Sequence, residues 1–396
     1  MTDTQTCPAC AADMPAGTLF CESCGASLSG AAAPDPGARP VDLKGALPAD
    51  GATPLDEAAP ISAATRPAAP AAAAAAETVP ARVPCHSCGG PIGPDGYCEQ
   101  CGTKAPSERD HFREAPADWV AGVCDRGIRH SRNEDAMALL ASPVAGERAL
   151  LLVLDGVSNT DDSHIASLAG ARAAREVLRT PLPQGMGTPE GRVAAVTKVF
   201  TDAVAAAQEA VVATTPAGSV SPPSATFVCV VVEGNRLSYA NIGDSRAYWF
   251  PDGAPGVQLS VDDSVAQQMI ASGISRAQAE TSPQAHAITK WLGRDAPDLA
   301  PTVGELDVTG PGWVMVCSDG LWNYASTPEE LTAQMQAAGV TEPAALALAL
   351  TDFANARGGI DNITVTLARL PGAPAGQNAP AETGSAGSVV DPEEKN

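Results

Sequence analysis

Two apolar runs in this sequence end abruptly in Asp-Gly. The segments 149–156 and 313–320 each contain five or six consecutive apolar residues and close on Asp155 and Asp319, each followed by glycine. A short continuous apolar run indicates a buried strand, so each segment places a carboxylate at the tip of a strand. The following glycine lets backbone or ligand approach closely. One Asp-Gly alone more often marks a simple turn, but two such tips can face a common site.

The charge balance narrows the classes of partner. The chain has 46 acidic and 24 basic residues, a formal net charge of -22. Nucleic-acid binding needs a local excess of Lys and Arg, so we expect no nucleic-acid partner. The acidity suits cation binding, although solubility alone also explains it.

The first residues lack the basic start and apolar segment of a signal peptide, and no stretch reaches the ~18 apolar residues of a membrane span. We therefore expect a cytoplasmic protein without a membrane partner.

Eight of the eleven cysteines form four Cys-x-x-Cys pairs. They group into two sets, Cys7, Cys10, Cys21 and Cys24, then Cys85, Cys88, Cys98 and Cys101. Each set offers four thiolates from two tight turns, which is what tetrahedral zinc requires, so the pattern predicts two structural Zn2+ ions. The alternative is a redox motif, but such motifs occur singly.

Both sets resemble the zinc ribbons of bacterial signalling proteins, which are usually structural or protein-docking modules. A nucleic-acid adaptor is a further alternative; the absence of Lys and Arg from residues 1–30 argues against it.

The sequence predicts five parts. These are a zinc ribbon over 1–30, an Ala/Pro-rich flexible linker over 31–81, a second zinc ribbon over 82–106, a catalytic domain over 118–370 and a disordered tail over 371–396.

Within the long domain, apolar and β-branched runs predict strands separated by helices. The predicted strands are Ala149–Leu154, Thr226–Val232, Leu237–Phe250, Trp313–Cys317 and Ile363–Ala368. Helices are expected over Ser163–Arg179, after Thr188-Pro189, and after Thr327-Pro328 with Glu330 completing a capping box. Grouped strands with helical pairs between them predict an α+β fold of antiparallel sheet covered by helices.

Five acidic motifs recur at the ends of these elements. They are Asn133-Glu134-Asp135, Asp155-Gly156, Gly243-Asp244-Ser245-Arg246, Ser318-Asp319-Gly320 and Asp361-Asn362. Each alone is typical of a turn or cap, but clustered carboxylates cannot all stay ionised without a cation. Oxygen ligands of this kind predict Mg2+ or Mn2+.

The order of these motifs resembles that of the metal-dependent type 2C (PPM) serine/threonine protein phosphatases, of the bacterial type. The likeness runs from about residue 120 to 370 and is carried by segments 125–135, 152–156, 224–226, 240–248, 314–321 and 359–365. The resemblance implies a four-layer α-β-β-α sandwich, in which two antiparallel sheets are flanked by helices.

The resemblance also implies roles for the acidic motifs. Asp155 would bridge two ions and the Gly156 carbonyl would bind the second, while Asp319 and Asp361 complete the first. Glu134 and Asp135 would support the second ion, and Asp244 with Asp319 a possible third. The catalytic set is therefore Asp135, Asp155, Asp319 and Asp361.

The implied reaction is hydrolysis of phosphate monoesters by a water that bridges two cations. The implied partners are proteins phosphorylated on Ser or Thr, in the pathway of a cognate bacterial Ser/Thr kinase, with the ribbons as docking modules.

Three positions depart from the family pattern. His130 stands where the family has a phosphate-binding arginine, and we expect His130, Arg129 and Arg132 to contact the substrate phosphate. Val157 stands where animal members of the family have a histidine that is the proposed general acid, and valine cannot donate a proton. Asp263 replaces a histidine in Leu259–Ser264.

These departures leave an alternative function open: a catalytically weak or inactive domain that binds phosphoproteins or acts as a scaffold. Intact Asp155, Asp319 and Asp361 favour the enzyme.

Overall fold

The computed structural model describes residues 88–94, 96–102, 105, 107–157, 160, 162–184 and 187–372, with the backbone of β1 (Thr4–Thr6) and β2 (Asp13–Pro15). The chain forms two compact units, residues 1–79 and 80–396, and β1 pairs with β2 inside the first. Five predicted zinc ligands lie outside the described residues, as do the predicted linker and nearly all of the tail; these ligands are Cys7, Cys10, Cys21, Cys24 and Cys85.

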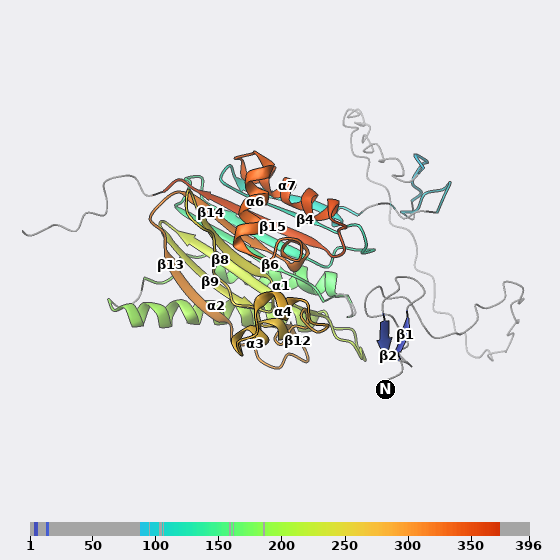
Figure 1. The fold of residues 1–396 in the computed structure, drawn as a ribbon, viewed down its shortest axis with the longest axis horizontal. Coiled ribbons are helices and arrows are strands. Elements are labelled where there is room, and N and C mark those ends of the chain that lie inside the picture. The colour runs from blue at the N-terminus through green and yellow to red at the C-terminus, as the bar shows by residue number, and fades with distance from the viewer. Residues whose placement is uncertain are drawn as a thin grey trace, which may run out of the picture. The chain divides into compact units, whose positions relative to one another are not determined.

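Two antiparallel sheets form the centre of the second unit (Figure 1). The six-stranded sheet has the order β11 (Val257–Gln258), β10 (Arg246–Pro251), β14 (Gly312–Cys317), β15 (Ile363–Leu370), β4 (Val120–Asp125), β3 (His111–Ala117). The five-stranded sheet has the order β13 (Thr302–Asp307), β9 (Arg236–Ile242), β8 (Phe227–Glu233), β6 (Arg148–Leu154), β5 (Ala136–Ala141). A small ladder joins β7 (Ser224–Ala225) to β12 (Leu292–Gly293).

Helices cover the outer face of each sheet. The helices are α1 (Ser163–Leu178), α2 (Pro189–Ala213), α3 (Val265–Ala271), α4 (Arg276–Glu280), α5 (Asp319–Trp322), α6 (Pro328–Ala338) and α7 (Pro343–Ala356). α1 and α2 share a buried cluster with the five-stranded sheet, and α5, α6 and α7 share one with the six-stranded sheet. A third buried cluster lies between the sheets. The predicted α-β-β-α layering is confirmed, and Figure 1 shows α6 and α7 on one side of the strands and α1 and α2 on the other.

The apolar sequence of β8 follows from this layering. Val228 and Val230 face the other sheet, whereas Cys229 and Val231 face the helices. Both faces are covered, so the strand is apolar throughout rather than alternating. Cys124, Cys229 and Cys317 are all fully buried, as expected for core cysteines.

One strand prediction was wrong. Leu237–Phe250 is not one strand: the chain turns at Gly243 with φ of 95°, so that β9 and β10 enter different sheets. β3, a strand that the sequence did not predict, pairs with β4 at the edge of the six-stranded sheet. The predicted helix starts are confirmed, with Thr188 capping α2 and Thr327 forming a capping box with Glu330.

None of the helices in the described part of the chain combines the length and apolar character that crossing a bilayer requires.

Strand register brings the acidic motifs to one end of the sandwich. Ala136 pairs with Leu154, so Asp135 and Asp155 lie at neighbouring strand ends. Cys317 pairs with both Val365 and Arg246, which places Asp319 near the residues just before β15 and β10. The two sheets therefore present their carboxylates together.

Candidate active site

Asp155 is fixed at the end of β6 by its own backbone. Its N–H donates to Thr226 Oγ1 at 3.0 Å, and its carbonyl accepts from Thr226 N–H at 2.8 Å. Gly156 follows, where an added Cβ would lie 2.5 Å from the carbonyl oxygen of Glu134. Only glycine lets these two backbones approach so closely.

Asp135 is fully buried and held through one oxygen only. Its Oδ2 accepts hydrogen bonds from Ser318 Oγ and Thr364 Oγ1, both at 2.7 Å. Its Oδ1 is buried without a hydrogen-bond partner in the described structure. An unpaired buried carboxylate oxygen is costly, which indicates a binding position for a donor or cation.

Asp319 repeats this pattern on the other sheet. Its Oδ2 accepts from Asn323 Nδ2 at 3.0 Å, while its buried Oδ1 has no hydrogen-bond partner among the described residues. Asp361, just before β15, accepts the Asn362 N–H at 2.7 Å through Oδ1, which also lies 3.3 Å from His130 Nε2.

Asp244 occupies the turn between β9 and β10. Its side chain is buried, and its backbone carbonyl accepts from Trp322 Nε1 at 3.0 Å. The predicted cation ligands thus come from both sheets.

Both carboxylate oxygens and the backbone carbonyl of Glu134 have partners within this chain. Its Oε1 accepts from Arg132 Nε at 3.0 Å and from Ser163 Oγ, and its Oε2 lies 3.7 Å from His130 Nδ1. Its backbone carbonyl accepts from Ser167 Oγ. The carboxylate therefore organises neighbouring side chains.

The carboxylates repel one another. Burial and the charges of Asp135, Asp319 and Asp361 raise the pKa of Asp155 well above its usual range, and burial with the neighbouring aspartates does the same for Asp319. Burial raises the pKa of Asp135 to about 6 and that of Asp244, with help from Asp262, to about 7. A cation among these groups would favour their ionised forms, so the donor set fits Mg2+ or Mn2+.

The predicted phosphate-binding residues lie beside this cluster, but they differ in whether their side chains already contact carboxylates of the chain. His130 lies between Asp361 and Glu134, and the hydrogen bond to Glu134 raises the pKa of the imidazole. Arg132 is committed to Glu134 at 2.9 Å, whereas Arg129 is exposed and its N–H donates to the Gly359 carbonyl. The carboxylates of Glu134 and Asp361 therefore favour the cationic form of the His130 ring.

Asp263, which replaces a histidine of the family that the sequence resembles, accepts a hydrogen bond from the backbone. Its Oδ2 accepts the Gly243 N–H at 3.1 Å, beside the turn that carries Asp244. His286, in the segment after α4, is exposed and stacks on Trp322 at 6.1 Å between ring centroids.

Several supporting residues were not predicted from sequence. Ser163 and Ser167 come from the start of α1, and Arg109 Nη2 donates to the carbonyls of Asn133 and Asp135 at 3.3 and 2.8 Å. An isolated serine or arginine forms no recognisable sequence motif. The roles of these residues depend on contacts between segments that are far apart in the sequence.

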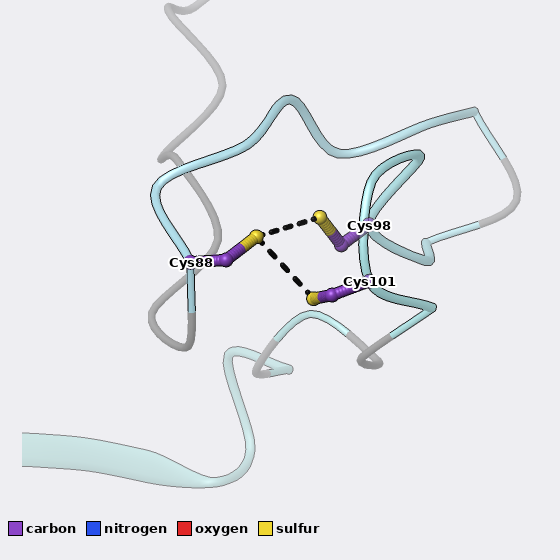
Figure 2. A group of neighbouring side chains, drawn as sticks. All are labelled: Cys88, Cys98 and Cys101. Carbon is purple, nitrogen blue, oxygen red and sulfur yellow. Dashed lines mark hydrogen bonds between the residues drawn. The ribbon is translucent and has the colours of Figure 1, made fainter.

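The second cysteine set is partly described (Figure 2). Cys88 Sγ lies 3.5 Å from Cys98 Sγ and 3.3 Å from Cys101 Sγ, and all three lie within 4.8 Å of one another. Gly89 and Gly102 have φ of 74° and 71°, as expected after metal-binding knuckles.

The raised carboxyl pKa values predict an unusual pH response of the cation-free protein. A folded pKa above the unfolded value of about 3.9 means that folding takes up protons, so the free energy of unfolding falls as pH rises from about 4 to about 7. Urea unfolding at about pH 5.5 and about pH 8 should show lower stability at the higher pH, by on the order of a few kcal/mol. Asp155→Asn should reduce this difference, and saturating Mn2+ should remove most of it. Stability that rises over this range would contradict the electrostatic account.

The sequence of this chain is similar to those of known phosphatases. A family model described as Protein phosphatase 2C matches residues 127–350, more than half of the chain. The serine/threonine protein phosphatase PstP of Mycobacterium tuberculosis is 29% identical over 287 residues, covering 67% of this chain and 47% of PstP. The protein phosphatase PhpP of Streptococcus pneumoniae is 32% identical over 149 residues, covering 37% of this chain and 57% of PhpP. The chain thus spans about half the length of the curated relatives it matches.

Solved structures share the fold. A serine/threonine phosphatase of S. agalactiae aligns with a TM-score of 0.53 at 21% identity, covering 65% of this chain and 100% of that one. The serine/threonine phosphatase Stp1 of Staphylococcus aureus aligns with a TM-score of 0.51 at 23% identity, covering 64% and 95%.

Proposed function

Because this chain belongs to the protein phosphatase 2C family, we propose that it is a Mg2+- or Mn2+-dependent phosphatase of proteins phosphorylated on serine or threonine. The convergence of Asp135, Asp155, Asp319 and Asp361 carries the proposal, because two of these carboxylates keep a buried oxygen without a hydrogen-bond partner in the described structure. Such oxygens are suited to cation binding.

The residues proposed to hold two cations are Asp155, the Gly156 carbonyl, Asp319 and Asp361, with Glu134 and Asp135 in support. Asp244 with Asp319 would hold a third. Bound cations supply positive charge that acidifies a water molecule and stabilises the phosphoryl oxygens.

The chain's own residues prepare the site for this chemistry. Ser318 and Thr364 hold one oxygen of Asp135 and leave the other, which is buried, without a hydrogen-bond partner in the described structure. Val157 provides no proton, so His130 is the protein group best placed to contribute charge or a proton near Asp361. Arg129 is the exposed cation beside it.

We infer that the physiological partners are cytoplasmic Ser/Thr phosphoproteins in the pathway of a cognate kinase. The names of PstP and PhpP support this class of substrate. A domain that only binds phosphoproteins is the alternative, supported by the engagement of Arg132 and His130 with carboxylates.

Peptide hydrolysis separates these functions. We would incubate the full chain and Mn2+ with matched phosphothreonine and phosphotyrosine peptides, and repeat each reaction with chelator. We expect phosphate release from phosphothreonine, little from phosphotyrosine, and none with chelator. Peptide binding without release would favour the binding module.

We also propose that the second ribbon binds structural Zn2+ through Cys85, Cys88, Cys98 and Cys101. The sulfur spacings of 3.3 and 3.5 Å for Cys88 are near the ~3.8 Å between sulfurs in tetrahedral zinc thiolates. Four thiolates leave no open position, so the ion would be structural and the ribbon would dock partners.

Zinc content tests this proposal. The purified full chain should contain two zinc ions, and Cys98→Ser should lose about one of them, since three remaining thiolates bind the ion more weakly. Cys229→Ser is the control, because Cys229 is buried in the sheet and far from any knuckle in sequence. Unchanged zinc in Cys98→Ser would contradict the site.

A further inference from the structure

A cleft away from the carboxylate cluster lies between the edge strands of the two sheets. β3 and β5 form two of its walls and α1 forms the third, and the cleft has a volume of 790 Å³. This is the size of pockets that hold small organic ligands, roughly 300–1,000 Å³. None of the proposed cation ligands lines it.

Three arginines line this cleft without ion-pair partners. Arg109, Arg172 and Arg175 have no carboxylate oxygen within 4.0 Å in the described structure. Arg109 Nε and Nη1 and Arg175 Nε are buried and have no hydrogen-bond partner there. Burial lowers the pKa of Arg109; the nearby groups of Cys124 and Asp135 oppose this shift, and the charge of Arg172 adds to it. Arg172 is exposed and Arg109 and Arg175 are half-buried, so water offsets part of the repulsion among the three guanidinium groups, and a bound anion would offset more of it.

In the described part of the chain, the acidic residues of the cleft form no close ion pair with these arginines, although burial raises the pKa of Glu114 and the charges of Arg175 and Arg172 act against that rise. Glu114 Oε2 accepts the Leu139 N–H at 3.1 Å, so this carboxylate satisfies the edge of β5. Glu108 is exposed. The strongly acidic chain thus concentrates unpaired positive charge here, whereas other arginines, such as Arg148 and Arg192, have glutamate partners at 3.3 and 3.1 Å.

The remaining lining is apolar. Phe112 and Leu168 are partly buried, and the Arg109 guanidinium lies 5.8 Å from the centre of the Phe112 ring. A ligand for this cleft therefore combines an anionic group with an apolar body.

We propose that this arginine cleft binds a small organic phosphate. Its phosphoryl oxygens would accept hydrogen bonds from Arg109, Arg172 and Arg175, and its apolar part would pack on Phe112 and Leu168. Planar guanidinium groups suit phosphate because they donate paired N–H groups to its oxygens.

Arg109 also links the cleft to the carboxylate cluster. Its Nη2 donates to the carbonyls of Asn133 and Asp135, and Asn133 Nδ2 donates back to the Arg109 carbonyl at 2.9 Å. A phosphate in the cleft would place negative charge beside the Arg109 guanidinium and so restrain the group that positions this loop. Occupancy of the cleft therefore regulates the placement of Asp135.

Binding of phenylphosphonate to the full chain without added divalent cation tests the proposal. This probe cannot be hydrolysed as an ester, and the cation-free carboxylate cluster repels it, so the measurement does not depend on phosphatase activity. We expect saturable binding by calorimetry and a higher Tm. Inorganic phosphate, which lacks the apolar part, should bind more weakly.

Matched variants locate the binding. Arg172→Gln with Arg175→Gln should weaken phenylphosphonate binding at least about tenfold, which corresponds to about 1.4 kcal/mol. Arg179→Gln, at the exposed end of the same helix, should leave it unchanged. Hydrogen exchange at residues 133–135 should slow in the wild type when the probe is bound.

Four outcomes would overturn the inference. They are no binding up to about 10 mM probe, equal binding by the double variant, equal loss in Arg179→Gln, and exchange at 133–135 that does not respond. A phosphopeptide that binds through Arg172 and Arg175 while phenylphosphonate does not would identify a protein partner in place of a small molecule.

Discussion

Asp319→Asn is expected to lower kcat/KM for a phosphothreonine peptide by at least about 100-fold. Losing a residue that only supports a metal ligand costs about 10- to 100-fold, so losing a direct ligand should cost at least as much. The substitution keeps the shape and the contact with Asn323 but removes the charge at the buried, unpaired Oδ1. Steady-state kinetics at saturating Mn2+ provides the measurement.

Asp352→Asn is the matched control for this loss. Asp352 is an exposed aspartate on α7, so the same change there should leave kcat/KM unaltered. Asp319→Asn should also abolish most of the rise in Tm that Mn2+ gives the wild type, because ligand binding stabilises the fold in proportion to affinity. A variant that keeps more than about a tenth of wild-type activity would exclude Asp319 as a ligand.

Asp262→Asn is expected to lower the free energy of unfolding by about 3 kcal/mol, because it removes the nearer of the two carboxylates that pair with a buried guanidinium. The other, Glu280, has Oε1 3.8 Å from Arg246 Nη2. Arg246 donates to Asp262 at 2.7–3.1 Å through Nε and Nη2, and both side chains are at most 4% exposed. The guanidinium also lies 3.6 Å from the ring centre of Trp322, whose Nε1 binds the Asp244 carbonyl. Urea unfolding provides the measurement.

The chain contains a second Asp–Arg pair of similar geometry as a control. Asp252 accepts from Arg369 at 2.6 and 2.8 Å, but the two side chains are 44% and 32% exposed. Asp252→Asn should cost no more than about 1 kcal/mol, because water solvates the remaining charge. Equal losses in the two variants would show that burial does not govern these pairs.

The strands that carry Asp155 and Asp319 could be predicted from the sequence alone. Both are apolar throughout because each lies inside a sheet covered on two faces, and such runs are the clearest periodic signal. The resemblance then predicted the layer order, which is confirmed.

Edge strands and sheet changes were not predictable in the same way. β3 reads His-Phe-Arg-Glu-Ala-Pro-Ala, a polar and proline-containing sequence that is tolerated because it lies at an edge. The break at Gly243 separates two strong strand sequences that belong to different sheets. The positive φ of Gly243 and its close packing against Thr226 are features of the folded chain, which no local sequence pattern predicts.

Contacts over long sequence separations account for the rest of the site. Arg109 is 26 residues from Asp135, and Thr364 is 229 residues from it. No local pattern encodes such pairs, because the fold creates them when β4, β5 and β15 come together.

A manganese titration of phosphothreonine-peptide hydrolysis, starting from chelator-treated full chain, tests the strand-end carboxylate cluster most directly. We predict no turnover without cation, a saturable rise as Mn2+ is added, and no such rise for Asp155→Asn. Turnover that is equal with and without cation, or wild-type protein that binds Mn2+ at Asp155 yet releases no phosphate, would contradict a catalytic cation site at these strand ends.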